Sequence, residues 1–445
     1  MITMRLTKAL GVKRNRVVSF VGAGGKTTAM FRLAEELIHD RWKVVTTTTT
    51  MLRREQRSEH TILESDHKTA LEKARSALTE HNHITLAASL SEAKGKLTGI
   101  APETVDALIA MPGVDGVIVE ADGAKGRSLK APAPYEPVIP QSTAILVPVA
   151  AVDAVGQPLD EDFVHRPEIV AGLVGAEMGQ IITPQMISTV LLHADGGLKS
   201  APPEATIIPL INKVSEDRTE AARDIARTLL ESTRVERVLL AAVAEEEPVK
   251  EAWGRVAAVV LAAGGSSRFG SPKQLLAWKG KTLLEHVVDT ALESSVQQVV
   301  VVLGHEAPRI GALLGHRSAE LVVNAHWAAG QSSSIRTGLQ AVQETCEACL
   351  FILADQPNLT SALLDQLVAR YRRTLAPIVA PVCRGRRGNP VLFSRALFRE
   401  LLHVRGDQGG RQVMRHHEHE IETLEVADES LFLDIDTVDD YERAK

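Results

Sequence analysis

The chain alternates between short apolar runs and segments in which apolar side chains recur every three or four positions. The runs at 16–21 and 43–50 are rich in Val and Thr, which favours strands. Between them, apolar residues follow helical spacing at Ala29, Met30, Leu33, Ala34, Leu37 and Ile38. Strands separated by helices are typical of a parallel sheet with both faces covered. Further candidate strands lie at 116–120, 144–149 and 206–211.

The same pattern starts again at residue 255. An apolar run ends in glycines, and a helical repeat follows at Leu283, Leu284, Val287, Val288, Ala291 and Leu292. Candidate strands follow at 298–303, 321–324, 350–355 and 377–382. Between the two patterns, AEEEPVKEAWG at 244–254 is acidic and interrupted by proline. We therefore predict an α/β protein with two doubly wound, mostly parallel-sheet domains at 1–245 and 255–445, joined by a linker at 246–254.

Composition narrows the possible functions. The chain has 445 residues and a net charge of −6, and only 3% of its residues are aromatic, which argues against a nucleic-acid partner. Three cysteines are too few for a disulfide framework. The apolar runs fall well short of the ~20 residues that span a bilayer, and the first residues lack the apolar core of a signal peptide. We expect a cytoplasmic protein that does not bind membranes.

The glycines that follow the apolar run at 255–263 suggest a phosphate site. Ligands of open parallel sheets bind beyond the carboxyl ends of the strands, and Gly264 and Gly265 would let the backbone approach a phosphate closely. Arg268 and Lys273 follow on the same loop and would supply positive charge to a triphosphate. The alternative is a plain glycine turn with solvated charges.

The string LAAGGSSRFGSPKQLL at 261–276 resembles the opening motif of a nucleotidyltransferase family that includes MocA-like cytidylyltransferases and MobA-like guanylyltransferases of the molybdenum cofactor. The family's other motifs follow in order as NAHWAAGQSSSIRTGL at 324–339, LADQP at 353–357, GNPVLF at 388–393, GDQGGR at 406–411 and LDIDTVDDY at 433–441. This resemblance implies a Rossmann-like nucleotidyltransferase domain over 255–445.

The resemblance also implies roles for individual residues. Asp355 would be a metal ligand and Asp436 the second, with Asp434 as the alternative. Arg268, Lys273 and Asp355 would be the catalytic residues. The residues implied at the nucleotide are Leu261, Ala262, Ala263, Gly264, Gly265, Ser333, Ser334 and Gly338. Those implied at the acceptor are Gly388, Asn389, Pro390, Asp407 and Arg411.

These residue types suit nucleotidyl transfer on chemical grounds. The reaction depends on positioning and charge neutralisation, so it needs no protein nucleophile. Mg²⁺ usually takes one or two carboxylates, which Asp355 and Asp436 would provide. The LAAG opening and the DQP motif resemble the cytidine branch, which implies CTP and the molybdopterin cofactor as substrates. Two alternatives remain: a cytidylyltransferase acting on a sugar or polyol phosphate, and a carrier that holds the cofactor and inserts it with little turnover.

The first glycine-rich segment, VGAGGKTT at 21–28, comes at the junction of a predicted strand and helix, the context of a P-loop. Its candidate nucleotide residues are Gly22, Gly24, Gly25, Lys26, Thr27 and Thr28, and the nucleotide would be ATP or GTP. Full P-loop spacing would place a glycine at position 20, where this chain has Phe20. The loop is therefore a variant form.

Two later segments would complete this second site. In GVIVEADGAKGRSLKAP at 116–132, Glu120 and Asp122 resemble the acidic metal partners of P-loop proteins. Lys125, Arg127 and Lys130 would face an anion or form a solvated loop. INKVSED at 211–217 resembles the base-reading element of GTPases. Ser215 stands at the specificity position of that element, so guanine selection does not follow.

GAGGKTT, EADGAKGRSLKAP, HRPE at 165–168 and INKVSED together resemble the YqeC family over roughly 10–245. That resemblance implies an accessory role for selenium-dependent molybdenum hydroxylases, with an apo-hydroxylase as client. Both halves thus point to molybdenum hydroxylase maturation.

Two further clusters favour structural readings. We expect Cys346 and Cys349 at a helix-to-strand junction as half-buried thiols rather than a zinc or redox pair. His403, His416, His417 and His419 alternate with charged residues, which favours a solvated segment over a metal site.

Overall fold

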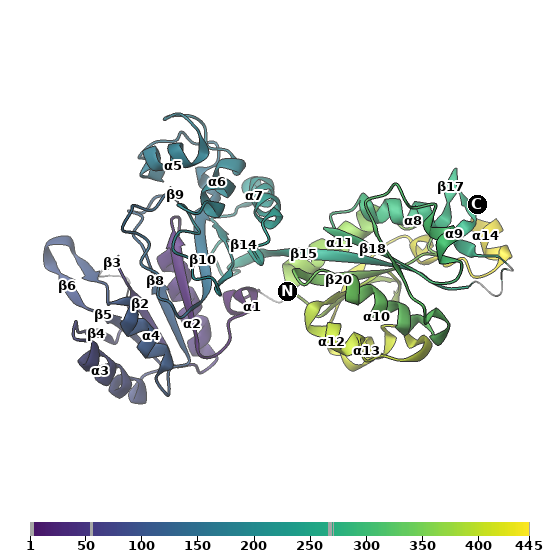
Figure 1. Cartoon of the computed structure of the whole chain (residues 1–445). Coiled ribbons are helices and arrows are strands. Elements are labelled where there is room, and N and C mark those ends of the chain that lie inside the picture. Colours follow the sequence, from purple (N-terminus) through teal and green to yellow (C-terminus); the bar gives the residue numbers. More distant parts are fainter. Residues whose placement is uncertain (1–3, 54–56, 266–268, 270, 445) are drawn as a thin grey trace. The chain divides into compact units, whose positions relative to one another are not determined.

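The computed structural model describes residues 4–53, 57–265, 269 and 271–444. The chain forms two compact units, which we call unit 1 (up to Trp253) and unit 2 (from Gly254). Both combine a sheet with covering helices, as the alternating pattern predicts (Figure 1). Within the described residues, no helix has the length and apolar character needed to cross a membrane.

Unit 1 is built on a parallel sheet. Its strands run in the order β4 (Thr61–Leu63), β5 (His83–Ala87), β2 (Val44–Thr48), β8 (Gly116–Glu120), β1 (Arg16–Gly22), β10 (Thr143–Ala151), β12 (Thr206–Ile207) with β13 (Leu210–Asn212), and β14 (Arg237–Ala241). The helices are α1 (Leu6–Leu10), α2 (Lys26–His39), α3 (His67–Glu80), α4 (Pro102–Ala110), α5 (Pro167–Val174), α6 (Pro184–Leu192) and α7 (Thr219–Glu231). The single strand predicted at 206–211 is interrupted before Leu210, where Pro209 has no N–H to donate.

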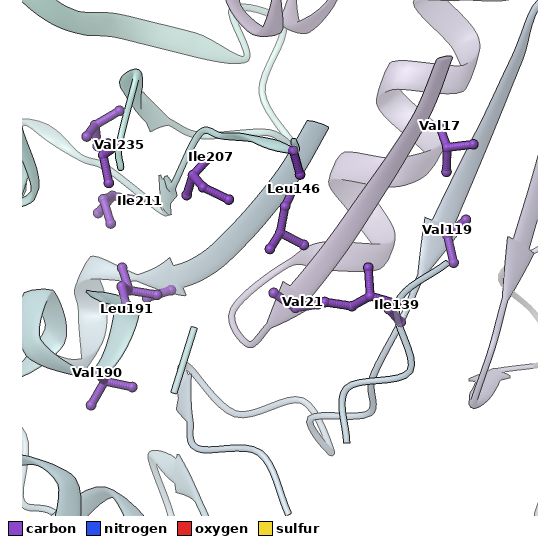
Figure 2. Close-up of a cluster of buried hydrophobic side chains, with 14 of the residues drawn as sticks. Val17, Val21, Val119, Ile139, Leu146, Val190, Leu191, Ile207, Ile211 and Val235 are labelled. Atoms are coloured by element: carbon purple, nitrogen blue, oxygen red, sulfur yellow. The ribbon is translucent and has the colours of Figure 1, made fainter. Parts of the chain in front are cut away.

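Two small sheets supplement the main one. Strands β3 (Met51–Arg53), β7 (Lys96–Thr98) and β6 (Ser89–Ser91) pair antiparallel, and β9 (Leu129–Lys130) pairs with β11 (Val164–His165). Strand side chains of the main sheet pack with the helices in one buried cluster, which includes Val17, Val21, Val119 and Leu146 of the strands and Val190 and Leu191 of α6 (Figure 2). This core fixes the carboxyl ends of the parallel strands.

Unit 2 has a mixed sheet in the order β19 (Glu320–Val323), β18 (Gln298–Leu303), β15 (Val249–Ala262), β20 (Cys346–Leu353), β23 (Val391–Ser394), β21 (Ile378–Cys383) and β24 (Ile421–Glu425). The first four strands are parallel, and β23 runs antiparallel to β20 and β21. The short strand β22 (Arg386–Arg387) pairs antiparallel with the end of β21, and β16 (Ala277–Trp278) and β17 (Lys281–Thr282) form a separate antiparallel pair. The helices are α8 (Leu283–Leu292), α9 (Ala307–Gly311), α10 (Gln331–Ala341), α11 (Ser361–Thr374), α12 (Phe398–Leu401), α13 (Arg411–His416) and α14 (Val438–Ala444).

Strand β15 begins before the end of unit 1. Trp253 is buried in the core of unit 1, and its indole N–H donates to Glu251 Oε2 at 2.7 Å. Glu251 also pairs with Arg223 of α7. From Arg255 onward the strand pairs with β20, and from Ala257 also with β18. The segment predicted as a linker, 246–254, therefore includes ordered strand residues.

Candidate functional sites at the strand ends

Unit 2 contains a cavity of about 360 Å³ beyond the carboxyl ends of β15 and β20. Its lining includes these predicted residues: Leu261, Ala263, Gly264, Gly265, Lys273, Ser334, Asp355 and Asp407. Arg268 lies outside the described residues. The loop after β15 is held by Gln274, whose amide donates to Ala262 O at 2.9 Å and Gly264 O at 2.8 Å.

The ionisable groups of this cavity cluster around Lys273. Its ammonium pairs with Asp355 and lies 3.5 Å from Asp436 Oδ1. Within the described structure, the buried Asp355 Oδ1 accepts no hydrogen bond. Burial and the charge of Asp355 raise the pKa of Asp434 to about 6, although a hydrogen bond from Gln356 opposes this. Such carboxylate oxygens are the ligands that hard divalent cations take in proteins.

The 324–339 segment divides between the cavity and the core. Ser334 lines the cavity, and so does Trp327, whose ring would lie 3.1 Å from a Cβ at Gly265. Ser333 is buried and bonds backbone carbonyls, including Gly330 O at 2.8 Å. Gly338 lies outside the lining, because α10 packs it against β15: a Cβ there would meet Val259 Cγ1 at 2.4 Å.

Most residues predicted at the acceptor lie outside this cavity. Asp407 lines it and accepts from the Gln331 N–H at 3.1 Å, whereas Arg411 is an exposed residue at the start of α13. Gly388 packs where a Cβ would meet the Phe432 ring at 2.4 Å. Asn389 and Pro390 follow it and are likewise absent from the described lining.

Unit 1 contains a larger cavity, of about 830 Å³. Its lining brings together segments that are far apart in the sequence: the glycine loop from Gly24 to Thr28, Glu120, residues 123–127, His165 with Arg166, and Lys213. The glycines permit this assembly, since a Cβ on Gly24 would lie 2.6 Å from Ala151 Cβ and one on Gly25 would lie 2.2 Å from Asn212 Nδ2. Both also have positive φ.

Lys26 is buried among acidic groups at the start of α2. Its ammonium donates to Gly22 O at 2.6 Å and lies 3.1 Å from Asp122 Oδ1 and 3.7 Å from Glu120 Oε1. Burial alone would lower the pKa of Lys26, but Asp122 and Glu120 outweigh it and raise that pKa. Burial raises the pKa of Glu120, which accepts a hydrogen bond from Thr27 Oγ1 at 2.6 Å.

The charges continue from Asp122 in an alternating chain. Lys130 lies 2.9 Å from Asp122 Oδ2 and 2.7 Å from Glu136 Oε2, and Arg166 lies 2.9 Å from the same Glu136 oxygen. Lys130 is therefore a buried structural cation rather than a solvated loop residue. Lys125 and Arg127, by contrast, line the cavity.

Asn212 joins two loops of unit 1. Its amide donates to Gly24 O at 2.7 Å, and its Oδ1 accepts from the Val243 N–H at 3.1 Å. Lys213 lines the cavity and lies 2.7 Å from Asp153 Oδ2, while Ser215 donates to Asp217.

Comparisons with known proteins agree with this division of the chain. Residues 18–168 match the model of the YqeC protein family, and residues 258–421 match the MobA-like NTP transferase domain. The chain therefore joins a YqeC domain to a MobA-like NTP transferase domain. Over 242 residues it is 29% identical to the uncharacterized protein YqeC of Escherichia coli K12, covering 53% of this chain and 91% of that protein.

Relatives that match the MobA-like unit include two of particular interest. The nicotine blue oxidoreductase of Paenarthrobacter nicotinovorans is 32% identical over 196 residues, covering 42% of this chain and 95% of that protein. The molybdenum cofactor cytidylyltransferase of E. coli K12 is 27% identical over 188 residues, covering 42% and 94%. A crystal structure of Rv0371c from Mycobacterium tuberculosis H37Rv is 31% identical and covers 43% of this chain and 97% of that one, with a TM-score of 0.39.

Both cavities also contain residues that were not among the predicted site residues. In the YqeC unit they include Arg53, Lys96, Tyr135 and Glu136, and in the MobA-like unit they include Gln274 and Gln331. Arg53 and Lys96 lie on strands of three residues, which are too short to leave a periodic pattern. Gln331 belongs to the 324–339 motif, where it follows Gly330 at the start of α10. That position at a helix start could have indicated it.

The two side clusters of the MobA-like unit are structural. Cys346 and Cys349 were expected at a helix-to-strand junction with half-buried thiols, and this was wrong: both are fully buried within β20, which begins four residues earlier than predicted. Burial raises the pKa of both thiols. His416 and His417 contact Glu400, and no cluster of three or more metal-ligating side chains occurs in the described part of the chain.

Proposed function

We propose that the MobA-like unit transfers CMP from CTP to the molybdopterin cofactor and releases pyrophosphate. The observation that carries the proposal is the grouping of Lys273 with Asp355 and Asp436 beside the glycines that follow β15. The similarity to a molybdenum cofactor cytidylyltransferase over 94% of that protein supports the choice of nucleotide and acceptor.

In this reaction the chain's residues position the nucleotide and balance its charge. Gly264 and Gly265 would bring backbone next to the phosphates, and Lys273, with Arg268, would stabilise the departing pyrophosphate. Asp355 and Asp436, with Asp434 as the alternative, would hold Mg²⁺, which supplies further charge neutralisation when bound. The unbonded Asp355 Oδ1 fits such a ligand role.

The deciding experiment measures pyrophosphate release by the full chain with Mg²⁺ and molybdenum cofactor, comparing CTP, GTP, ATP and UTP. Cofactor-dependent release with CTP alone is the expected result. Release with GTP alone would assign the unit to guanylyl transfer, and release with a sugar or polyol phosphate in place of the cofactor would change the acceptor. Cofactor binding without any release would favour a carrier.

The similarity to an oxidoreductase calls for one additional measurement. The nicotine blue oxidoreductase matches the same unit at 32% identity, so relatives with this fold bear names from more than one reaction class. Spectroscopic detection of redox turnover of nicotine blue, with reduced nicotinamide cofactors as electron donors, separates that activity from nucleotidyl transfer. We expect no turnover there and pyrophosphate release with CTP.

For the YqeC unit we propose nucleotide binding at the glycine loop, with ATP or GTP as the ligand. Backbone N–H groups at the start of α2 would attract the phosphates. Lys26 would move from its carboxylate partners onto the phosphates, and Thr27 with Glu120 would hold the accompanying Mg²⁺. The unit would serve delivery of the finished cofactor to an apo molybdenum hydroxylase. Co-purification of the full chain with such a hydroxylase, with and without nucleotide, tests that role.

A further inference from the structure

Two cavities meet at the glycine loop of the YqeC unit. The larger one, of about 830 Å³, and a second one, of about 370 Å³, share Thr27 and Thr28. The smaller cavity is lined by Phe31 of α2 and by Val243 and Ala244, which follow β14. The glycine loop also lines the larger cavity, so phosphates bound there would fill part of it. A base placed in the smaller cavity would still leave the part of the larger cavity around residues 123–127 for another ligand.

The larger cavity is strongly cationic. Among its described lining residues are seven Lys or Arg side chains and two Glu, in a chain whose net charge is −6. Three of the seven cations have carboxylate partners: Lys26 pairs with Asp122, Arg166 with Glu136 and Lys213 with Asp153. The positive charge around the cavity is thus only partly balanced, which favours an anionic occupant.

The Lys and Arg side chains that line the larger cavity fall into two groups, one at the glycine loop and one near the loop after β8. Lys26 belongs to the glycine loop, where it would serve the nucleotide, whereas Lys125 and Arg127 belong to the loop after β8. Arg53 comes from a different element, β3, and lies near that loop, since its Nη2 would be 3.8 Å from a Cβ at Gly126. This second group of cations is more than one triphosphate at the glycine loop requires.

The same cavity has an exposed aromatic ring on its lining. Tyr135 is 74% exposed, although only 3% of the residues in the chain are aromatic. It directly precedes Glu136, whose carboxylate is fixed by Lys130 and Arg166. An exposed ring beside cations is suited to a planar ligand that also carries negative charge.

Resting on the nucleotide site proposed above, we infer that the larger cavity of the YqeC unit binds a second small molecule, an aromatic ring compound that carries a phosphate. Its ring lies against Tyr135, and its phosphate is held by Lys125 and Arg127. The nucleotide occupies the glycine loop and the smaller cavity at the same time. The YqeC unit would then bind two ligands at once, a nucleotide and an aromatic phosphate.

The test is isothermal titration of the full chain with 4-methylumbelliferyl phosphate, in Mg²⁺ and a saturating non-hydrolysable ATP analogue. Because charged hydrogen bonds carry much of the affinity, Lys125→Glu with Arg127→Glu should weaken the probe about tenfold or more. Tyr135→Ala should weaken the probe but leave the weaker binding of inorganic phosphate unchanged. The matched control is Arg75→Glu, a charge reversal on the exposed face of α3, which should leave probe binding unchanged. Circular dichroism and thermal unfolding check that each variant is folded.

The outcomes separate this inference from the nucleotide proposal. Probe binding that is unaffected by Lys125→Glu with Arg127→Glu overturns the second site, even if nucleotide binds. Strict competition between probe and ATP analogue also overturns it, because the large cavity would then be the nucleotide's own seat. Failure of ATP and GTP to bind, with probe binding still sensitive to the charge reversal, overturns the nucleotide proposal and leaves the aromatic phosphate site standing.

Discussion

The side-chain amide of Asn212 donates a 2.7 Å hydrogen bond to the carbonyl of Gly24, 188 residues earlier in the chain. The same side chain accepts from Val243, so it connects the glycine loop to the segment after β14. Asn212 belongs to the segment 211–217, which resembles the base-reading element of GTPases, yet here its side chain supports the glycine loop. If Asn212 supports the glycine loop, its replacement should lower the stability of the fold and not only the affinity for nucleotide.

Replacing Asn212 with Ala should lower the free energy of unfolding by about 1–3 kcal/mol, because it leaves a buried Gly24 carbonyl and a Val243 N–H without their partner. Urea unfolding of the full chain measures this. The neighbouring Lys213→Ala is the control: it removes a partly exposed ion pair and should cost less than about 1 kcal/mol. Equal costs for the two variants would contradict the supporting role.

Two glycines of the MobA-like unit should respond in opposite ways to Ala. Gly338→Ala places a Cβ 2.4 Å from Val259 Cγ1 and should lower stability by about 1–3 kcal/mol through overpacking. Gly264→Ala meets nothing within 4 Å in the described structure, so it should leave stability unchanged and raise the KM for CTP. Thermal unfolding and steady-state kinetics provide the two readouts. A raised KM without lost stability in Gly338→Ala would argue for a nucleotide contact instead.

Asp355→Asn should reduce pyrophosphate release about 100-fold or more while the protein stays folded, because it removes a charge placed beside Lys273 in the cavity. The control is Asp439→Asn, which neutralises an exposed carboxylate of α14. Full activity in Asp355→Asn would refute the proposed mechanism.

Lys26→Met should weaken ATP or GTP binding about tenfold or more, since it removes the ammonium at the glycine loop. It also leaves Asp122 and Glu120 with one fewer cation, so Thr27→Ala is a second variant that keeps the buried charges. Calorimetric titration of both variants, with exposed Lys68→Met as control, measures the effect. Unchanged affinity in both would place the nucleotide elsewhere.

Acid should destabilise the YqeC unit partly through His83. Burial lowers the pKa of His83 to about 4 from a usual 6.5, and the ring shares a 3.0 Å hydrogen bond with Thr46 Oγ1. The unfolded chain takes up a proton below pH 6.5 while the folded chain does not until about pH 4. This contribution to stability is therefore complete above pH 6.5 and declines as the pH falls toward 4.

Between pH 7.5 and 5.0 the loss should be on the order of 1–2 kcal/mol. His83→Gln should flatten this part of the pH profile of unfolding, whereas His39→Gln, an exposed residue at the end of α2, should not. Parallel pH profiles for His83→Gln and the unmodified chain would exclude His83 as the source.

Sequence patterns predicted the longer elements at both cavities because these elements are regular. The run before Gly22 became β1, the helical repeat from Ala29 to Ile38 became part of α2, and Gln298–Leu303 was predicted with its observed bounds. Motif spacing likewise led to Lys26 at the start of α2, to Glu120 as the last residue of β8, to Asp355 just after β20, and to Lys273 in the loop that follows β15.

The orientation and burial of several motif residues depend on tertiary packing, which the sequence pattern does not show. Gly338 and Ser333 belong to a quoted motif, yet helix packing turns Gly338 toward Val259 and Ser333 toward backbone carbonyls. Lys130 belongs to a segment whose composition suggests a solvated loop, but it lies in β9, where it is buried and pairs with Asp122 and Glu136. Tyr135 left no pattern at all, since a single exposed aromatic residue in a loop has no periodicity.

The position of Trp253 has a practical consequence for separating the two activities. A fragment that stops at residue 245 would lose Trp253 and Glu251, and with them a piece of its own hydrophobic core and the partner of Arg223. The fragment that begins at residue 246 would carry Trp253 without the core of unit 1 that buries it, which would expose an apolar side chain. Dividing the chain after Trp253 avoids both problems. If a fragment that ends at residue 245 is inactive, the loss can come from its damaged core and does not show that it needs the other unit.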